Sequence, residues 1–83
     1  MSNYQIYINP HCGNCAPAIA RMRAAVTAMG HPAPDVVNVL DDVDGAVRLR
    51  ITRVPALVRD GQVLVQGAAG HRALQRAIRQ EKA

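Results

Sequence analysis

Alternating apolar and polar residues open the chain. Residues 4–8 read YQIYI, are rich in aromatic and β-branched side chains, and stop at Asn9-Pro10, which is the pattern of a β-strand. Within residues 15–30, apolar side chains then recur at spacings of three and four. The recurring positions are Ile19, Met22, Val26 and Met29. This spacing predicts an amphipathic helix that ends at Gly30.

The middle of the chain predicts a second strand and a short helix. Residues 34–40 read PDVVNVL, an apolar run that follows a proline-rich turn and favours a strand buried on both faces. Residues 41–50 read DDVDGAVRLR, with acids at the start and arginines at the end. This charge order suits a helix dipole, although Gly45 lowers the helix propensity.

The last third of the chain predicts a hairpin and a final helix. In residues 54–67, VPALVRDGQVLVQG, two β-rich runs meet at Asp60-Gly61, a strong hairpin signal. After Gly70, the apolar positions 74, 77 and 78 fall on one side of a helix, and arginines occupy its other faces.

The order of these elements, βαβαββα, indicates the fold class. A strand-helix-strand unit implies parallel pairing with a right-handed crossover, and the hairpin adds an antiparallel edge. We therefore expect an α/β fold with a mixed four-stranded sheet and three helices. The length of 83 residues suits a single domain over residues 1–83, too short for a separate cofactor domain.

Composition and charge narrow the class of partner. The net charge is +4, but the basic residues are spread over the chain and Tyr4 and Tyr7 are the only aromatics. We therefore expect no nucleic-acid partner, whereas a cationic face would favour acidic protein partners. The sequence contains no signal peptide pattern and no apolar run of membrane-spanning length. A cytoplasmic monomer without a membrane partner is the expectation.

The stretch NPHCGNC, residues 9–15, holds the only two cysteines, Cys12 and Cys15. It lies between the first strand and the first helix, where unpaired N–H groups and the helix dipole stabilise a thiolate. Cys12 is the expected nucleophile, since it lies nearer the exposed end, and Cys15 is the resolving thiol. With Asn14 as N-cap, Pro17 falls in the first turn, where it costs little; a kinked helix that starts earlier is the alternative.

Other functions for the cysteine pair stay open at this point. His11 could favour the Cys12 thiolate, contact a partner, or be merely solvated. The two thiolates could hold Cu(I), or they could hold zinc together with two of the three histidines at positions 11, 31 and 71. A structural staple is a further alternative, although a reducing cytoplasm and a four-residue loop disfavour it. We predict no metal and no cofactor.

The segments IYINPHCGNCAPAI and ITRVPALVRDGQVLVQG together resemble the thioredoxin-like superfamily, in particular its short, glutaredoxin-sized members. The similarity extends over nearly the whole chain. It implies a dithiol-disulfide oxidoreductase, with a cis-proline at Pro55 beside the active site and backbone hydrogen bonds from Val54 to a bound peptide. The expected substrate-contacting residues are His11, Gly13, Asn14, Val54 and Pro55.

Two departures from the family pattern concern the electron path. His11 and Ile6 stand where typical thioredoxins have a tryptophan and a buried aspartate, and QGAAGHR lacks the acidic pair with which glutaredoxins bind glutathione. The expected partners are a disulfide-containing protein and a reductase or low-molecular-weight thiol as electron source. A CxxC metal chaperone and a non-enzymatic partner-binding module are the alternative functions.

Overall fold

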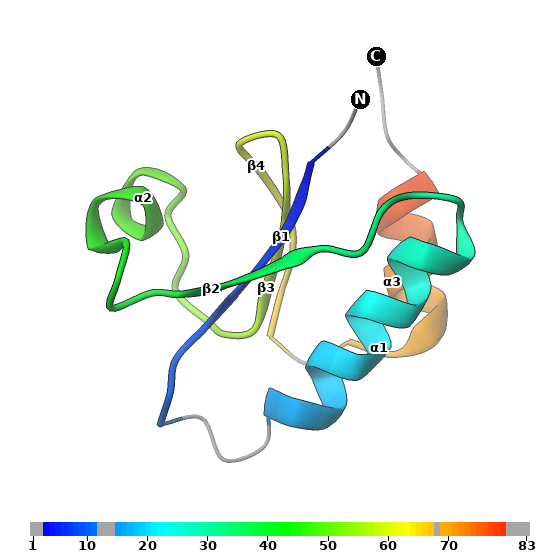
Figure 1. Cartoon of the computed structure of the whole chain (residues 1–83), viewed down its shortest axis with the longest axis horizontal. Coiled ribbons are helices and arrows are strands. Elements are labelled where there is room, and N and C mark those ends of the chain that lie inside the picture. The colour runs from blue at the N-terminus through cyan, green and yellow to red at the C-terminus, as the bar shows by residue number, and fades with distance from the viewer. Residues whose placement is uncertain (1–2, 12–14, 68, 80–83) are drawn as a thin grey trace.

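The structure, a computed structural model, describes residues 3–11, 15–67 and 69–79. Its helices and strands follow the predicted order, and Figure 1 shows the sheet between the helices. The elements are β1 (Tyr4–Ile8), α1 (Cys15–Ala28), β2 (Asp35–Asn38), α2 (Val43–Arg48), β3 (Ala56–Arg59), β4 (Gln62–Gln66) and α3 (His71–Arg79). The predicted α/β class is therefore confirmed.

The strands form one four-stranded sheet in the order β2-β1-β3-β4. β1 pairs in parallel with β2, and antiparallel with β3, which in turn pairs antiparallel with β4. The sheet is mixed, as the element order predicted. The prediction that β2 is buried on both faces is wrong: its side chains are exposed or half-buried, with Val36 41% exposed. β2 lies at the sheet edge, where it has a strand neighbour on one side only.

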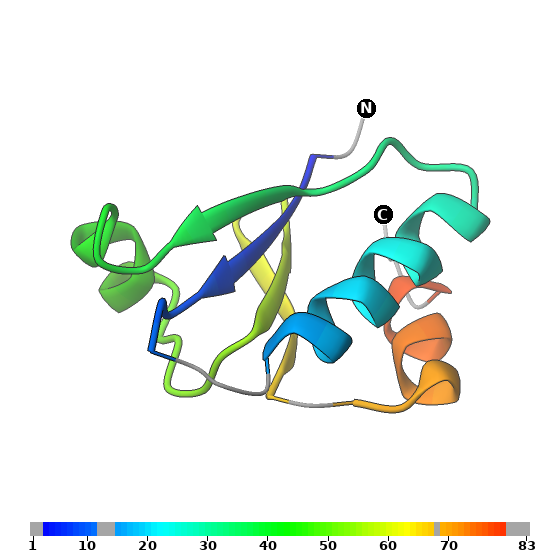
Figure 2. The same cartoon turned by 60° about the horizontal axis from the view of Figure 1, so that its bottom comes forward.

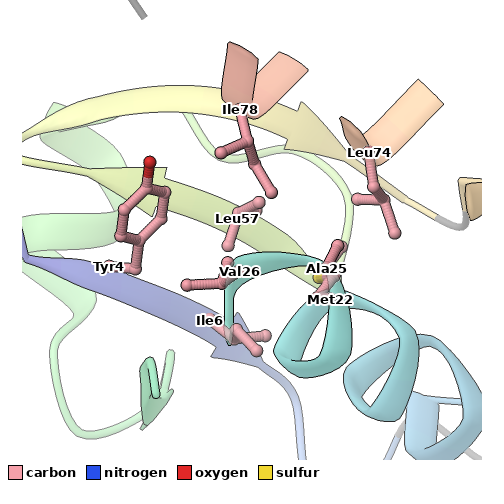
Figure 3. Close-up of a cluster of buried hydrophobic side chains, with 8 residues drawn as sticks. All are labelled: Tyr4, Ile6, Met22, Ala25, Val26, Leu57, Leu74 and Ile78. Atoms are coloured by element: carbon pink, nitrogen blue, oxygen red, sulfur yellow. The ribbon is translucent and has the colours of Figure 1, made fainter. Parts of the chain in front are cut away.

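The main core lies between the sheet and the layer formed by α1 and α3 (Figure 3). Its buried side chains come from both helices and from the two central strands. They are Tyr4, Ile6, Met22, Ala25, Val26, Leu57, Leu74 and Ile78. These side chains are aliphatic or methionine except for Tyr4, whose buried ring belongs to the same core.

Gly30 ends α1 as predicted. Its φ is +88°, a conformation that glycine adopts without steric cost. The amide of Gly30 donates to the carbonyl of Thr27 at 3.0 Å, and the amide of His31 donates to the carbonyl of Val26 at 3.3 Å. These two bonds form a Schellman motif, which satisfies carbonyl groups at the helix end.

α2 lies on the other face of the sheet, above a smaller core around Tyr7. The Tyr7 hydroxyl donates to Oδ2 of Asp42 at 2.9 Å, and Oδ1 of the same carboxylate accepts from the Gly45 amide at 3.1 Å. A Cβ added at Gly45 would overlap with the Asp42 carboxylate. The glycine expected to weaken this helix therefore makes room for its N-cap.

The hairpin also forms where the sequence predicted it. Asp60 and Gly61 have φ angles of 49° and 81°, so both central residues of the turn lie in the left-handed region, as a type I′ turn requires. In the described part of the chain, none of the helices has the length and hydropathy needed to cross a membrane.

Candidate functional site

Cys15 is the first residue of α1, and its side chain is buried with 4% of its surface exposed. Pro17 is consequently the third residue of the helix, within the first turn, where its missing N–H leaves no hydrogen bond unmade. A start at Cys15 is the one expected with Asn14 as N-cap, and the residues at which an earlier helix would begin lie outside the described ones. The sulfur of Cys15 takes part in a disulfide. Cys12, Gly13 and Asn14 lie outside the described residues, so their roles stay predictions.

The chain that enters the cysteine motif is shaped by Asn9. Its side-chain oxygen accepts a hydrogen bond from the backbone amide of His11 at 2.9 Å, the geometry by which an asparagine turns the chain two residues on. His11 itself is exposed. In the sequence, Asn9 marks the end of a strand, and the Asn-Pro dipeptide is also a recognised turn signal.

The second part of the site is the loop that enters β3. The Val54–Pro55 peptide bond is cis, as the family resemblance implied, and the Pro55 carbonyl accepts a hydrogen bond from the Gly67 amide at 2.9 Å. Tyr7 pairs with Ala56 in the antiparallel β1–β3 ladder. The segment that leaves β1 toward His11 and the segment that enters β3 therefore lie side by side at one end of the two central strands. Figure 2 shows the first turn of α1 at this same end of the molecule.

Gln66, the last residue of β4, holds the loop before Val54. Its Oε1 accepts hydrogen bonds from the backbone amides of Thr52 at 2.8 Å and Arg53 at 3.1 Å. Its Nε2 donates to the carbonyl of Arg50 at 3.4 Å, a residue with a positive φ of 59°. No local pattern in the sequence indicates this role of Gln66, because its bonds join segments far apart in the chain.

An apolar groove of about 330 Å³ lies between the end of β1, α2 and the same loop. Its lining residues are Asn9, Val39, Leu40, Val43, Ala46, Val47, Ile51, Thr52 and Val54. Leu40, Val43 and Val47 expose between 55% and 70% of their surface, so α2 turns apolar side chains outward as well as toward the sheet. The groove reaches Val54, the residue before the cis bond.

Tyr7 connects the helix beside this groove to the sheet. Burial raises the pKa of Tyr7 above its ordinary value, and the hydrogen bond to Asp42 and the negative charge of Asp42 raise the pKa further, while Arg48 opposes them. Each of these effects favours the protonated hydroxyl, which is the form that donates to the carboxylate.

The histidines considered as zinc ligands have separate roles in the fold. His31 follows the end of α1, with its ring 4.9 Å from that of Tyr4, and His71 begins α3. Among residues 3–11, 15–67 and 69–79, no group of three or more histidine, cysteine, aspartate or glutamate side chains is arranged to bind a metal ion.

Comparison with known proteins agrees with this geometry at the level of the family. Searches of the curated proteins and of the solved structures gave no significant match. The sequence model of the thioredoxin domain, in contrast, matches residues 2–79, which is nearly the whole chain. The mixed sheet, Cys15 at the start of α1 and the cis-proline directly before β3 thus accompany a family match: the chain belongs to the thioredoxin domain family.

Proposed function

We propose that this protein is a thiol-disulfide oxidoreductase that reduces disulfides of other proteins. The observation that carries the proposal is the position of Cys15 at the start of α1, at the end of the sheet where cis-Pro55 directly precedes β3. The buried side chain of Cys15 suits a resolving thiol, which reacts within the protein and needs no access to the partner.

The reaction proceeds by two exchanges. The Cys12 thiolate attacks one sulfur of the partner's disulfide, which forms a mixed disulfide and releases the other sulfur as a thiolate that takes up a proton. The Cys15 thiolate then attacks the Cys12 sulfur, which closes the Cys12–Cys15 disulfide and releases the partner's remaining thiolate. The partner gains two electrons and two protons, which the cysteine pair loses. The disulfide at Cys15 corresponds to the oxidised end of this cycle.

The remaining predicted residues serve the partner. Val54 and Pro55 present the backbone of the β3 entrance to the partner's disulfide segment, and the adjoining apolar groove accommodates its neighbouring side chains. His11, Gly13 and Asn14 contact the partner around the nucleophile. A reductase or a low-molecular-weight thiol returns the pair to the dithiol. We place this monomeric enzyme in the cytoplasm, where a reduced pair is maintained.

A trapping experiment tests the proposal. Wild-type protein should accelerate the reduction of a disulfide-cyclised peptide by dithiothreitol. Cys15→Ser, which retains the nucleophile, should accumulate a mixed disulfide with the peptide, visible as an adduct in mass spectrometry. The matched control Cys12→Ser should form no adduct at equal peptide concentration.

Two results would contradict this function. Wild-type protein without any acceleration would remove the enzymatic assignment. If the reduced protein in addition bound Cu(I) stoichiometrically through both thiolates, a metal chaperone would replace the oxidoreductase.

A further inference from the structure

The described residues of α1 and α3 include exposed arginines and no acid. Both helices pack on the same face of the sheet (Figure 1), and neither contains an aspartate or glutamate. Their basic residues, all exposed, are Arg21, Arg23, Arg72, Arg76 and Arg79. We call this set the arginine layer. It carries more positive charge than the net +4 of the whole chain.

The acidic residues of the described chain lie elsewhere. Four of them belong to the segment from β2 to α2, and one lies in the β3–β4 turn. They are Asp35, Asp41, Asp42, Asp44 and Asp60. Arg48, Arg50 and Arg53 accompany the acids of this segment, so the charges there nearly balance, whereas the arginine layer has no acid among the described residues of its two helices.

Helix stability accounts for only part of the arginines of α3: Arg76 and Arg79 lie in its last turn, where the helix dipole favours a cation, but Arg72 does not. Arg72 lies in the first turn, where the helix dipole disfavours a cation, and Arg76 follows it four residues later, a spacing at which like charges repel. Arg72, Arg76 and Arg79 line one hollow of about 290 Å³. The repulsion between Arg72 and Arg76 disfavours the isolated helix, and an anionic partner that covers both side chains relieves it.

The arginine layer begins beside the proposed redox site. The Gly67 amide donates to the Pro55 carbonyl, so the connection from β4 to α3 starts at the cis-proline. Along the same connection, Arg21 donates from Nε to the carbonyl of Ala69 at 3.3 Å. α3 therefore leads away from the β3 entrance, with Arg72 near its first turn and Arg79 at its end.

We propose that the arginine layer binds acidic segments of the proteins whose disulfides reach Cys12. This inference rests on the proposed function. A protein partner suits both the arginine layer and the apolar groove, which each begin near the entrance to β3. Its acidic side chains pair with the arginines, while its apolar side chains enter the groove at Val54. A nucleic acid would use the arginines alone, since Tyr4 and Tyr7, the only aromatics, are each 4% exposed and leave no surface for base stacking.

Two peptides that differ only in the sign of their charge test the proposal through binding, without any disulfide exchange. Two fluorescent, cysteine-free peptides share one apolar centre and differ in flanks of glutamate or lysine. Anisotropy at about 20 mM NaCl should give the glutamate peptide at least about tenfold tighter binding, and about 500 mM NaCl should abolish the difference. The triple variant R72Q/R76Q/R79Q should show no preference.

A matched pair of single variants distinguishes an effect of the arginine layer from an effect of the net charge of the protein. Arg76→Gln and Arg48→Gln each remove one positive charge, but only Arg76 belongs to the arginine layer. Arg76→Gln should weaken binding of the glutamate peptide by about threefold or more, and Arg48→Gln should change it less. Equal effects of the two variants, or equal binding of the two peptides to wild type, would overturn the proposal.

Two further measurements complete the test. Disulfide-cyclised forms of the same peptides report exchange: if neither is reduced, the oxidoreductase function fails, while the binding preference still decides the role of the arginine layer. A duplex of about 20 base pairs that binds more tightly than the glutamate peptide at about 150 mM NaCl would assign the layer to nucleic acid instead.

Discussion

At the scale of single residues, Asp42 joins the start of α2 to the sheet. One carboxylate oxygen accepts from the Gly45 amide and caps the helix, and the other accepts from the Tyr7 hydroxyl beneath it. α2 has only six residues, far fewer than a helix needs to be stable alone in water. Its position therefore depends on these contacts and on the small core around Tyr7.

Replacing Tyr7 by phenylalanine should destabilise the protein by about 1 kcal/mol at neutral pH, because one partly buried hydrogen bond is lost. The effect should also depend on pH. The pKa of Tyr7 is raised above 10.0, so the unfolded chain loses this proton at lower pH than the folded protein. The stability from Tyr7 is complete below pH 10.0 and falls as the pH rises through the folded pKa. Urea denaturation between neutral and alkaline pH measures both effects.

Tyr4→Phe is the matched control. The Tyr4 hydroxyl is buried and has no hydrogen-bond partner in the described part of the chain, so its removal should leave stability unchanged or raise it. If Tyr7→Phe and Tyr4→Phe had equal effects at neutral pH, the Tyr7–Asp42 bond would contribute nothing to folding.

Residues whose role is local could be predicted from the sequence. Gly30 and Asp60-Gly61 act within a few positions of the chain, and the structure places the helix end and the turn there. Gly45 shows where this reasoning stops. Its propensity predicts a weaker helix, whereas its purpose is space for Asp42, whose other contact lies 35 positions away at Tyr7. Propensity scales contain no information on such distant partners.

At the scale of elements, hydrogen bonds from the end of strand β4 stabilise the loop that contains the cis-proline. Gln66 binds the backbone of Arg50, Thr52 and Arg53, and the next residue binds Pro55. The loop has no helix or strand pairing of its own between α2 and β3. Its conformation before Val54 is therefore set largely by one amide side chain.

Gln66→Ala should accelerate hydrogen exchange at the amides of Thr52 and Arg53, because both lose their acceptor. Global stability should fall by about 1 kcal/mol, since the bonds are solvent-exposed and contribute less than buried ones. Hydrogen exchange followed by NMR measures the two amides individually.

Gln62→Ala at the other end of β4 should change neither amide, because Gln62 is exposed and remote from the loop. Gln66→Glu should retain most of the protection, since a carboxylate still accepts from both amides. Unaltered exchange in Gln66→Ala would show that the loop holds its conformation without this side chain.

Element order and strand pairing follow from patterns in the sequence, but exposure does not. The apolar run at 34–40 indicates a buried strand, yet β2 lies at the sheet edge. Likewise, the apolar residues 40, 43 and 47 indicate burial, yet they line an open groove beside Val54. A sequence pattern does not distinguish an apolar side chain in the core from one that lines an open groove. The groove therefore became visible only in the structure.

At the scale of the whole molecule, repulsion among the arginines of the arginine layer destabilises the folded state. Folding brings its positive charges onto one face, and salt screens their repulsion. Raising NaCl from about 20 mM to about 300 mM should therefore raise the thermal unfolding midpoint by a few degrees. Differential scanning calorimetry measures the shift.

The triple variant R72Q/R76Q/R79Q should unfold at a higher temperature in low salt and respond less to NaCl. Glutamine preserves helix propensity, so the comparison isolates charge. An equal salt response in both proteins would mean that the arginines lie too far apart in solution to repel one another.

The bond between Tyr7 and Asp42 also bears on protein engineering. Apart from Asn9, the residues that line the groove fall within the contiguous segment 39–54, which makes this segment attractive for transfer to another scaffold. Its helix, however, is anchored by a hydroxyl that comes from β1, outside the segment. A recipient needs a tyrosine at the matching position of the neighbouring strand, together with Gly45, before a transplanted groove keeps its shape.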